Sequence, residues 1–186
     1  SVKGTRDYNV LYSKYYRSRK ASKRRRNSAF FTATTNQLSK YDPIFKEYSQ
    51  QIPYDWLLLA ALSFQESRFD PRTTSWAGAK GLMQLMPNTA AQYGITNLYQ
   101  PEQSVKAGVK YIQWLESNFW RERIPDKDER KRFVLASYNA GPGHVRDAQR
   151  LTKKYDGNPK KWANVSEFLL KKAKPEYYND EVVKYG

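Results

Sequence analysis

Apolar residues recur at helical spacing along most of the chain, and this pattern predicts its secondary structure. Residues 54–67 (YDWLLLAALSFQES) are apolar nearly all round, which is typical of a buried helix. A second helix is expected over residues 101–120, whose apolar positions are Val105, Val109, Ile112, Leu115 and Phe119. A third is expected over residues 126–140, with inward positions at Phe133, Ala136 and Ala140.

Start and stop signals mark further helices. Asp42 and Pro43 open one, because Asp is a common N-cap and Pro suits the first helical position. A short helix is expected over residues 87–94, between a proline and a glycine, and two more over residues 143–155 and 160–173. No segment alternates at period two for long enough to predict a strand. The pattern therefore indicates a mainly α fold of about seven short helices.

Residues 1–40 lack this periodicity and differ in charge. They hold 11 Lys or Arg against the single acid Asp7, so they contribute +10 of the net charge of +15. We interpret them as a basic linker or arm, followed by one domain over residues 41–186. A solvated linker is the favoured interpretation of this charge. Contact with an anionic surface is the alternative, and nucleic acid is a less favoured partner.

Missing residue types exclude several kinds of chemistry. The chain has no cysteine, so thiolate metal sites and nucleophiles are excluded. His144 is the only histidine, so no His cluster can bind zinc, and a solvated or capping role is expected for it. The glycine-containing loop GAKGLM lacks the pattern of a phosphate-binding loop. We therefore expect neither a metal nor a cofactor, and no apolar run is long enough to span a membrane.

Glu66 stands out among the charged residues. It follows the apolar residues 57–64 and precedes Asp70-Pro71. Low-dielectric surroundings disfavour the charged carboxylate and raise its pKa, so Glu66 could donate a proton near neutral pH, as a general acid must. A Glu exposed at a helix end fits the local pattern too, and on that pattern alone it is the favoured interpretation.

Glycoside hydrolysis normally needs a second carboxylate. Asp70 is close in sequence, but it precedes Pro71 and is expected to shape the turn. Other acids stand in polar segments where solvated side chains are expected: Glu102, Asp126, Asp128 and Asp147. No partner for Glu66 is therefore predicted. The 15 Tyr and 5 Trp suit a carbohydrate-binding groove, although cores and interfaces use such rings as well.

Three motifs together resemble one family. They are Glu66-Ser67, SWAGAKGLMQLMP from Ser75 to Pro87, and SYNAGPG from Ser137 to Gly143. In this order and at this spacing they closely resemble the lysozyme-like lytic transglycosylases of bacterial cell walls, and the likeness covers roughly residues 41–186. The resemblance implies a lysozyme-like fold of the goose-type lysozyme and soluble lytic transglycosylase kind, with a catalytic cleft.

The resemblance also implies an activity. Such enzymes cleave the β-1,4 bond between N-acetylmuramic acid and N-acetylglucosamine in peptidoglycan without water and leave a 1,6-anhydro ring. Glu66 would be the sole catalytic acid and base, and Tyr138 could hydrogen-bond it. The residues implied to bind the glycan are Ser67, Ser75, Met83, Gln84, Tyr138 and Asn139. Because the sugar's own 6-hydroxyl attacks, the lack of a second carboxylate is expected rather than awkward.

Alternatives stay open at this stage. A goose-type lysozyme-like hydrolase would share the fold and motifs, and a non-catalytic module could bind glycan or nucleic acid. The family usually continues into a helix with another cleft tyrosine, so either the domain is truncated at its C-terminus or an equivalent tyrosine, Tyr177, Tyr178 or Tyr185, takes that place. The resembled proteins also carry an upstream domain like a periplasmic solute-binding protein. Residues 1–40 would then be its linker, and the location would be the periplasm, in association with the outer membrane.

Overall fold

The computed structural model describes residues 37–185. The chain divides into two units between Pro43 and Ile44, and each is described by itself. Almost all of the predicted basic arm lies outside the described residues, so the arm and its boundary stay predictions. The described helices are α3 (Asp42–Ser49), α4 (Trp56–Ser67), α5 (Pro87–Ala91), α6 (Pro101–Trp114), η1 (Leu115–Trp120), α7 (Lys127–Ala140), α8 (Pro142–Lys154), α9 (Trp162–Lys171) and α10 (Pro175–Tyr178).

The prediction of a mainly α fold is confirmed for the described residues. Each predicted helix is present, and only isolated β-bridges occur in residues 37–185, from Lys80 to Thr74 and to Leu85. α5 ends at Ala91, three residues before the predicted glycine stop at Gly94. The sequence pattern missed α10, because its four residues are too few to show a helical period.

In the first unit, Asp42 does not cap α3 as predicted. It is the first residue of the helix, and its carboxylate accepts hydrogen bonds from the backbone N–H of Leu38 at 2.8 Å and of Ser39 at 2.9 Å. The side chain therefore folds back on the preceding turn. The N-cap interaction that we expected with the first turn of α3 is replaced by these upstream bonds.

α4 is less buried than its apolar sequence predicted. Asp55 is its N-cap and accepts the N–H of Leu58 at 2.8 Å. One face, with Leu59 and Ala60, is in the core, but the side chain of Leu57 is 49% exposed. The prediction of a helix buried all round is therefore wrong, because α4 packs through one face only.

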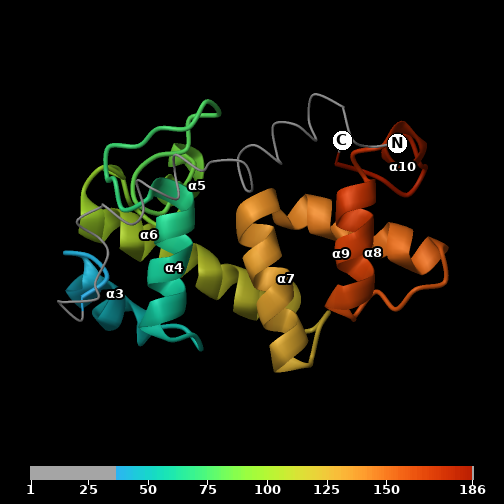
Figure 1. The fold of residues 1–186 in the computed structure, drawn as a ribbon, viewed down its shortest axis with the longest axis horizontal. Helices are drawn as coiled ribbons and strands as arrows, with labels where there is room; N and C mark the ends of the chain where they lie inside the picture. The colour runs from blue at the N-terminus through green and yellow to red at the C-terminus, as the bar shows by residue number, and fades with distance from the viewer. Residues whose placement is uncertain (1–36, 186) are drawn as a thin grey trace. The chain divides into compact units, whose positions relative to one another are not determined.

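α6 and η1 form one continuous rod, as residues 101–120 predicted. The π-helical part begins after Trp114, and the rod passes from the side of α4 and α5 to the side of α7 (Figure 1). Trp120, near its end, has no exposed surface, and its Nε1 donates to Ser137 Oγ of α7 at 2.9 Å. The rod therefore fixes α7 through a buried contact.

α4 and α7 end on the same side of this unit. In Figure 1 both helices run upward, so their C-terminal ends point to the same side of the view. Glu66 is in the last turn of α4, and Tyr138 and Asn139 are in the last turn of α7. The ends of α4 and α7 on this side carry two of the three sequence motifs.

Candidate functional site

Glu66 is half-buried at the C-terminal end of α4. The backbone turns sharply after Ser67, because Arg68 and Phe69 both adopt left-handed conformations, with φ of 55° and 63°. Asp70 Oδ1 then accepts the N–H of Arg72 at 2.9 Å, so its predicted role in the turn is confirmed. These features end the helix directly after Glu66 and leave its side chain at the helix terminus.

The pKa of the Tyr138 phenol is affected by Glu66. Burial, the negative charge of Glu66 and the neighbouring Tyr111 together raise the pKa of the Tyr138 phenol well above its usual value. Its hydroxyl donates to the carbonyl of Met83 at 2.8 Å. Tyr138 therefore stays protonated and neutral at neutral pH. Its phenol lies close enough to Glu66 for the carboxylate charge to raise its pKa.

Ser67 supports the helix end. It is buried, and its Oγ donates to the carbonyl of Ser63 at 3.1 Å. Ser63 in turn donates its own hydroxyl to the carbonyl of Leu82 at 3.2 Å. The two serines thereby tie the last turns of α4 to the loop that carries the second motif.

Ser75 and Gln84 hold that loop in shape. The Ser75 hydroxyl accepts the N–H of Ala79 at 3.0 Å. Gln84 has a left-handed backbone, and its side-chain amide donates to the carbonyls of Thr73 at 3.0 Å and Gly81 at 2.9 Å. Both side chains are half-buried, so these bonds leave part of their polar surface open to a ligand.

The two methionines of the second motif lie in different environments. The side chain of Met83 has no exposed surface and packs against Gly108 of α6, where an added Cβ would lie 2.8 Å from Met83 Cε. Met86, three residues later, is 43% exposed at the start of α5. Met83 thus contributes to the site through its carbonyl, which accepts from Tyr138, rather than through its side chain. Met86, which the sequence interpretation passed over, is the methionine that can contact a ligand.

Asn139 is exposed at the end of α7. The helix stops after Ala140, because Gly141 takes a positive φ of 89° and its N–H returns to the carbonyl of Ser137 at 2.8 Å. Asn139 and Tyr138 are adjacent in the sequence, but one side chain is open to solvent and the other is bonded into the fold.

A row of aromatic rings leads away from Tyr138. Tyr111 of α6 contacts Tyr138 with ring centroids 5.5 Å apart and stacks on Trp114 at 6.0 Å. Burial and nearby Tyr93 raise the pKa of Tyr111 to about 12. Trp114 is 38% exposed and borders a hollow of about 430 Å³. The hollow is lined by Gln51, Pro53, Tyr93, Lys110, Gln113, Trp114, Glu116, Ser117 and Asn118.

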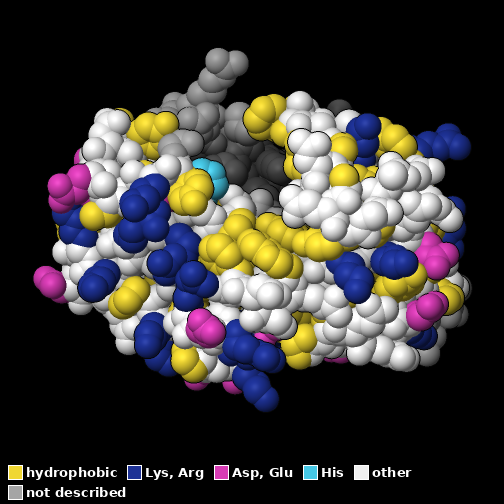
Figure 2. Space-filling view, turned by 180° about the vertical axis from the view of Figure 1, so that it is seen from behind, with side chains coloured by type: hydrophobic (Ala, Val, Ile, Leu, Met, Phe, Trp, Pro, Cys, Tyr) yellow, Lys and Arg dark blue, Asp and Glu magenta, His cyan; other side chains and the backbone are white. Residues whose placement is uncertain are grey.

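Such a surface suits a sugar chain. Exposed rings stack on the C–H faces of sugars, and polar groups around them bind hydroxyl and N-acetyl groups. A band of hydrophobic side chains crosses the face seen in Figure 2, with Lys and Arg side chains beside it. Trp76, beside Ser75 in the second motif, adds a fully exposed indole. The helical spacing of Trp114 to Tyr111 could have signalled the aromatic row, whereas nothing local marked Trp76 as exposed.

Two buried carboxylates were missed or misjudged from the sequence. Glu116 accepts from Arg130 Nε at 2.5 Å and from Tyr54 Oη at 2.7 Å, and burial and this carboxylate raise the pKa of Tyr54. Asp147, expected to be solvated, has no exposed surface and pairs with Lys172 at 2.5 Å. Asp147 was judged by its polar neighbours in the sequence, and Glu116 was not considered. Their cationic partners Lys172 and Arg130 lie far from them in the sequence.

His144 is half-buried rather than solvated, and its Nδ1 lies 2.8 Å from Lys172 Nζ. It belongs to the same cluster as Asp147. Within residues 37–185, no group of three or more His, Cys, Asp and Glu side chains could hold a metal ion. The same stretch contains no helix long and apolar enough to cross a membrane.

Comparison with known proteins places these motifs in a family. The sequence model described as Transglycosylase SLT domain matches residues 43–161. The membrane-bound lytic murein transglycosylase F of Haemophilus influenzae is 42% identical over 158 residues, which are 85% of this chain and 32% of that protein. The protein of that name from Pseudoalteromonas translucida is 43% identical over 158 residues, with the same coverage.

The chain thus spans about a third of the length of these relatives. A crystal structure of the 70 kDa soluble lytic transglycosylase from Escherichia coli is also similar, with a TM-score of 0.46, 25% identity, and coverage of 77% of this chain and 25% of that one. The matched residues 43–161 include Glu66, the loop from Ser75 to Gln84, and the pair Tyr138 and Asn139. The chain therefore belongs to the Transglycosylase SLT domain family, as its three motifs predicted.

Proposed function

We propose that the chain is a peptidoglycan lytic transglycosylase that cleaves the β-1,4 bond between N-acetylmuramic acid and N-acetylglucosamine. One observation carries the proposal: Glu66, in the last turn of α4, lies close enough to half-buried Tyr138, in the last turn of α7, that burial and the charge of Glu66 both raise the pKa of the Tyr138 phenol. Family membership and the lytic murein transglycosylase names of the relatives support it.

In the first step Glu66, protonated, gives its proton to the oxygen of the leaving N-acetylglucosamine while the bond to the anomeric carbon breaks. The substrate's own N-acetyl group stabilises the positive charge that develops at that carbon. In the second step the 6-hydroxyl of the muramic acid attacks the anomeric carbon and passes its proton to the Glu66 carboxylate. The 1,6-anhydro ring closes, Glu66 is protonated again, and no water is consumed.

The neighbouring groups suit these roles. Tyr138 remains a neutral phenol, so it does not compete with Glu66 for the proton that is transferred. The exposed Trp114 and Met86, the half-buried Ser75 and Gln84, and Asn139 would contact the glycan. The Met83 carbonyl would act indirectly, by holding the Tyr138 hydroxyl.

The ion pairs of two buried carboxylates, Glu116 and Asp147, favour a lyase over a goose-type hydrolase. A hydrolase needs a second carboxylate that is free to activate water. Glu116 is paired with Arg130, and Asp147 is paired with Lys172 and Arg150. A carboxylate committed to a buried cation is a poor base, so Glu66 would act alone.

The location and partners follow from the substrate. We place the chain in the periplasm, with the glycan strands of peptidoglycan as its partner and an association with the outer membrane in the full-length protein. An upstream solute-binding-like domain and an anionic contact through residues 1–40 are parts of the same proposal. The relatives are named membrane-bound lytic murein transglycosylase F, which supports the envelope location.

The proposal is tested by digesting purified peptidoglycan and identifying the products by mass spectrometry. We expect 1,6-anhydro muropeptides. Products heavier by one water molecule would replace the proposal with a goose-type hydrolase, and glycan binding without any product would replace it with a binding module. Glu66→Gln should abolish measurable turnover, since general acid–base catalysis contributes about 10²–10⁴-fold. Glu122→Gln, an exposed control, should leave turnover unchanged.

A further inference from the structure

The row of aromatic rings that begins at Tyr138 continues along η1 and ends at an arginine. The ring of Trp114 contacts that of Phe119 with centroids 5.3 Å apart, and the guanidinium of Arg123 lies over the Phe119 ring at 5.0 Å. In the other direction, Tyr111 joins Trp114 to Tyr138, and no two neighbours in the row are more than 6.0 Å apart. The row therefore connects the proposed reaction site to a cation.

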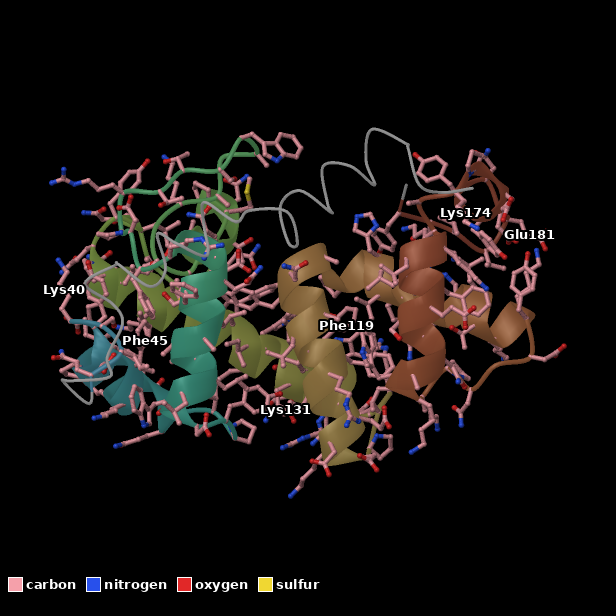
Figure 3. All side chains as sticks on the ribbon, in the orientation of Figure 1. Lys40, Phe45, Phe119, Lys131, Lys174 and Glu181 are labelled. Atoms are coloured by element: carbon pink, nitrogen blue, oxygen red, sulfur yellow. The ribbon has the colours of Figure 1, made fainter. Side chains whose placement is uncertain are left out.

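The far part of this row is open to solvent. Trp114 is 38% exposed and Phe119 is half-buried, whereas Arg123 is exposed in the turn that follows η1. Phe119 lies beside α7 in Figure 3, as expected from the packing of η1 against that helix. The hollow bordered by Trp114 adds polar side chains from the same rod, Ser117 and Asn118. An extended ligand with both apolar and polar groups therefore suits this surface.

Arg146 adds a second guanidinium at the arginine end of the row. It is half-buried on α8, and its Nη1 donates to Gln149 Oε1 at 2.7 Å. Burial and the positive charges of Arg123 and Arg150 lower the pKa of Arg146, so these three guanidinium groups lie near one another. The charge of Arg150 is balanced by its ion pair with Asp147.

Arg123 and Arg146 lack such a counterion among residues 37–185. In that stretch Arg130, Arg132 and Arg150 each pair with a carboxylate, but neither of these two does. Like charges that lie close together repel each other, and a bound anion relieves the repulsion. The planar guanidinium presents two parallel N–H groups that match the two oxygens of a carboxylate. The pair of arginines therefore suits a ligand with a free carboxylate.

We propose that Arg123 and Arg146 bind a carboxylate of the peptide that the muramic acid of peptidoglycan carries. This inference rests on the proposed function and names a second part of the substrate that the chain recognises. The residues from Tyr111 to Phe119 advance about 12 Å along the helix axis. An extended peptide of about four residues spans that length, at about 3.3 Å per residue. A short acidic peptide that starts beside Tyr138 therefore extends along the aromatic row to the two arginines.

The experiment measures the affinity of two soluble probes for the full chain in a Glu66→Gln background, where binding occurs without turnover. One probe is glycan strands that carry their peptides, and the other is the same strands after an amidase has removed the peptides. Arg123→Gln should weaken binding of the peptide-bearing strands by about two- to fivefold, the range for a solvent-exposed ion pair. It should leave binding of the peptide-free strands unchanged, and Arg146→Gln should act in the same way.

Arg132→Gln is the matched control. Arg132 is exposed in the N-terminal half of α7 and pairs with Glu129, so this variant loses the same charge outside the proposed contact. It should bind both probes like the parent. Equal losses for Arg132→Gln and Arg123→Gln, or equal losses for both probes, would show that net charge alone attracts the strands, and the proposal would be overturned.

A third probe tests the carboxylate itself. Peptide-bearing strands whose carboxylates have been converted to amides should bind the parent as weakly as Arg123→Gln binds the unmodified strands. Arg123→Gln should cause no further loss with this probe, because the group that the arginine contacts has already been neutralised. If the amidated strands bind the parent as tightly as the unmodified ones, the carboxylate is not recognised and the inference is wrong.

The outcomes separate this inference from the proposed function and from a different anionic partner. If the parent binds both kinds of strand equally well, the peptide contact is wrong and the proposed function stands. If the parent binds neither, both fail. Phosphatidylglycerol vesicles provide the remaining comparison: variants that lose vesicle binding and keep strand binding would replace the peptide contact with a membrane contact. Circular dichroism melting of each variant verifies that folded chains are compared.

Discussion

The chemistry of the site depends on how Tyr138 and Glu66 affect one another. Burial opposes ionisation of the phenol, and the charge of Glu66 opposes it further. The hydroxyl therefore remains a donor, and in the structure it donates to the Met83 carbonyl at 2.8 Å. This bond joins α7 to the loop of the second motif, so one residue serves both the stability of the site and its electrostatics.

Tyr138→Phe tests this double role. The variant keeps the ring contact with Tyr111 but leaves the buried Met83 carbonyl without the phenol as a donor. We expect the free energy of unfolding to fall by about 1–3 kcal/mol, the cost of an unsatisfied buried polar group. Urea denaturation measures it. Tyr99→Phe removes an exposed hydroxyl that bonds Thr74, and its effect should stay within about 0.5 kcal/mol. Equal losses for the two variants would contradict the argument.

Individual residues also show how far neighbouring residues in the sequence predict the environment of a side chain. Glu66 and Tyr138 were singled out because each belongs to a motif, and their roles stay predictions. The environment of Met83 was not predictable, since a methionine beside a cleft motif has the same sequence context whether it points to solvent or packs on Gly108. Asp147 was misjudged for a similar reason, because Lys172 lies 25 residues away on another helix. Such partners are decided by tertiary packing.

At the scale of elements, the sequence pattern predicted where helices occur but not the residues at which they begin and end. Helical spacing predicted α6 with η1 and α7, because each buries one face over several turns, whereas start and stop signals predicted α8 and α9. The boundaries depend on capping bonds, such as that from Leu58 N–H to Asp55, which a period does not reveal. The loop of the second motif is the most informative element, since its shape depends on backbone positions rather than on an apolar pattern.

Gly81 and Gly94 show two different reasons why a position requires glycine: backbone conformation alone, or backbone conformation together with a close contact. Both have positive φ, 77° and 72°. A Cβ at Gly81 would lie 1.8 Å from the Leu98 carbonyl oxygen, whereas one at Gly94 would meet nothing within 4 Å. Gly94→Ala should therefore cost only backbone strain, about 1–2 kcal/mol. Gly81→Ala should cost a further 1–3 kcal/mol or so, from displacement of the backbone.

Urea denaturation of the two variants measures the difference. Because Gly81 lies between Ser75 and Gln84 in the second motif, Gly81→Ala should also reduce peptidoglycan turnover, which Gly94→Ala should preserve. Similar stability losses would show that the contact between the loop and Leu98 is not tight, and that backbone strain alone selects glycine at both positions.

At the scale of the molecule, charge is distributed unevenly. Residues 1–40 hold 11 of the 33 Lys and Arg, whereas 17 of the 18 acids lie in residues 41–186. Two of these acids, Glu116 and Asp147, form ion pairs with buried cationic side chains. The folded unit therefore depends on the ionisation of a few carboxylates, which makes its stability sensitive to acid.

The pKa of Asp147 determines in which direction stability changes with pH. Burial alone would raise its pKa, but hydrogen bonds from Lys172, the N–H groups of Lys184 and Tyr185, and Arg150 outweigh it and lower the pKa below 3.8. The unfolded chain therefore binds the proton more readily than the folded one. The stability that Asp147 contributes is complete above the unfolded pKa, and it is lost as pH falls through the lower pKa of the folded state.

Urea denaturation between pH 6 and pH 3 should accordingly show a decline in the free energy of unfolding that begins as pH approaches about 4. Asp147→Asn should be less stable at pH 6, because Lys172 loses its buried counterion, and its decline on acidification should be shallower. Glu122→Asn, an exposed control, should keep the parent's slope. Parallel slopes for Asp147→Asn and the parent would mean that other carboxylates control the acid response. They would also mean that the buried cluster does not dominate the electrostatic stability of the fold.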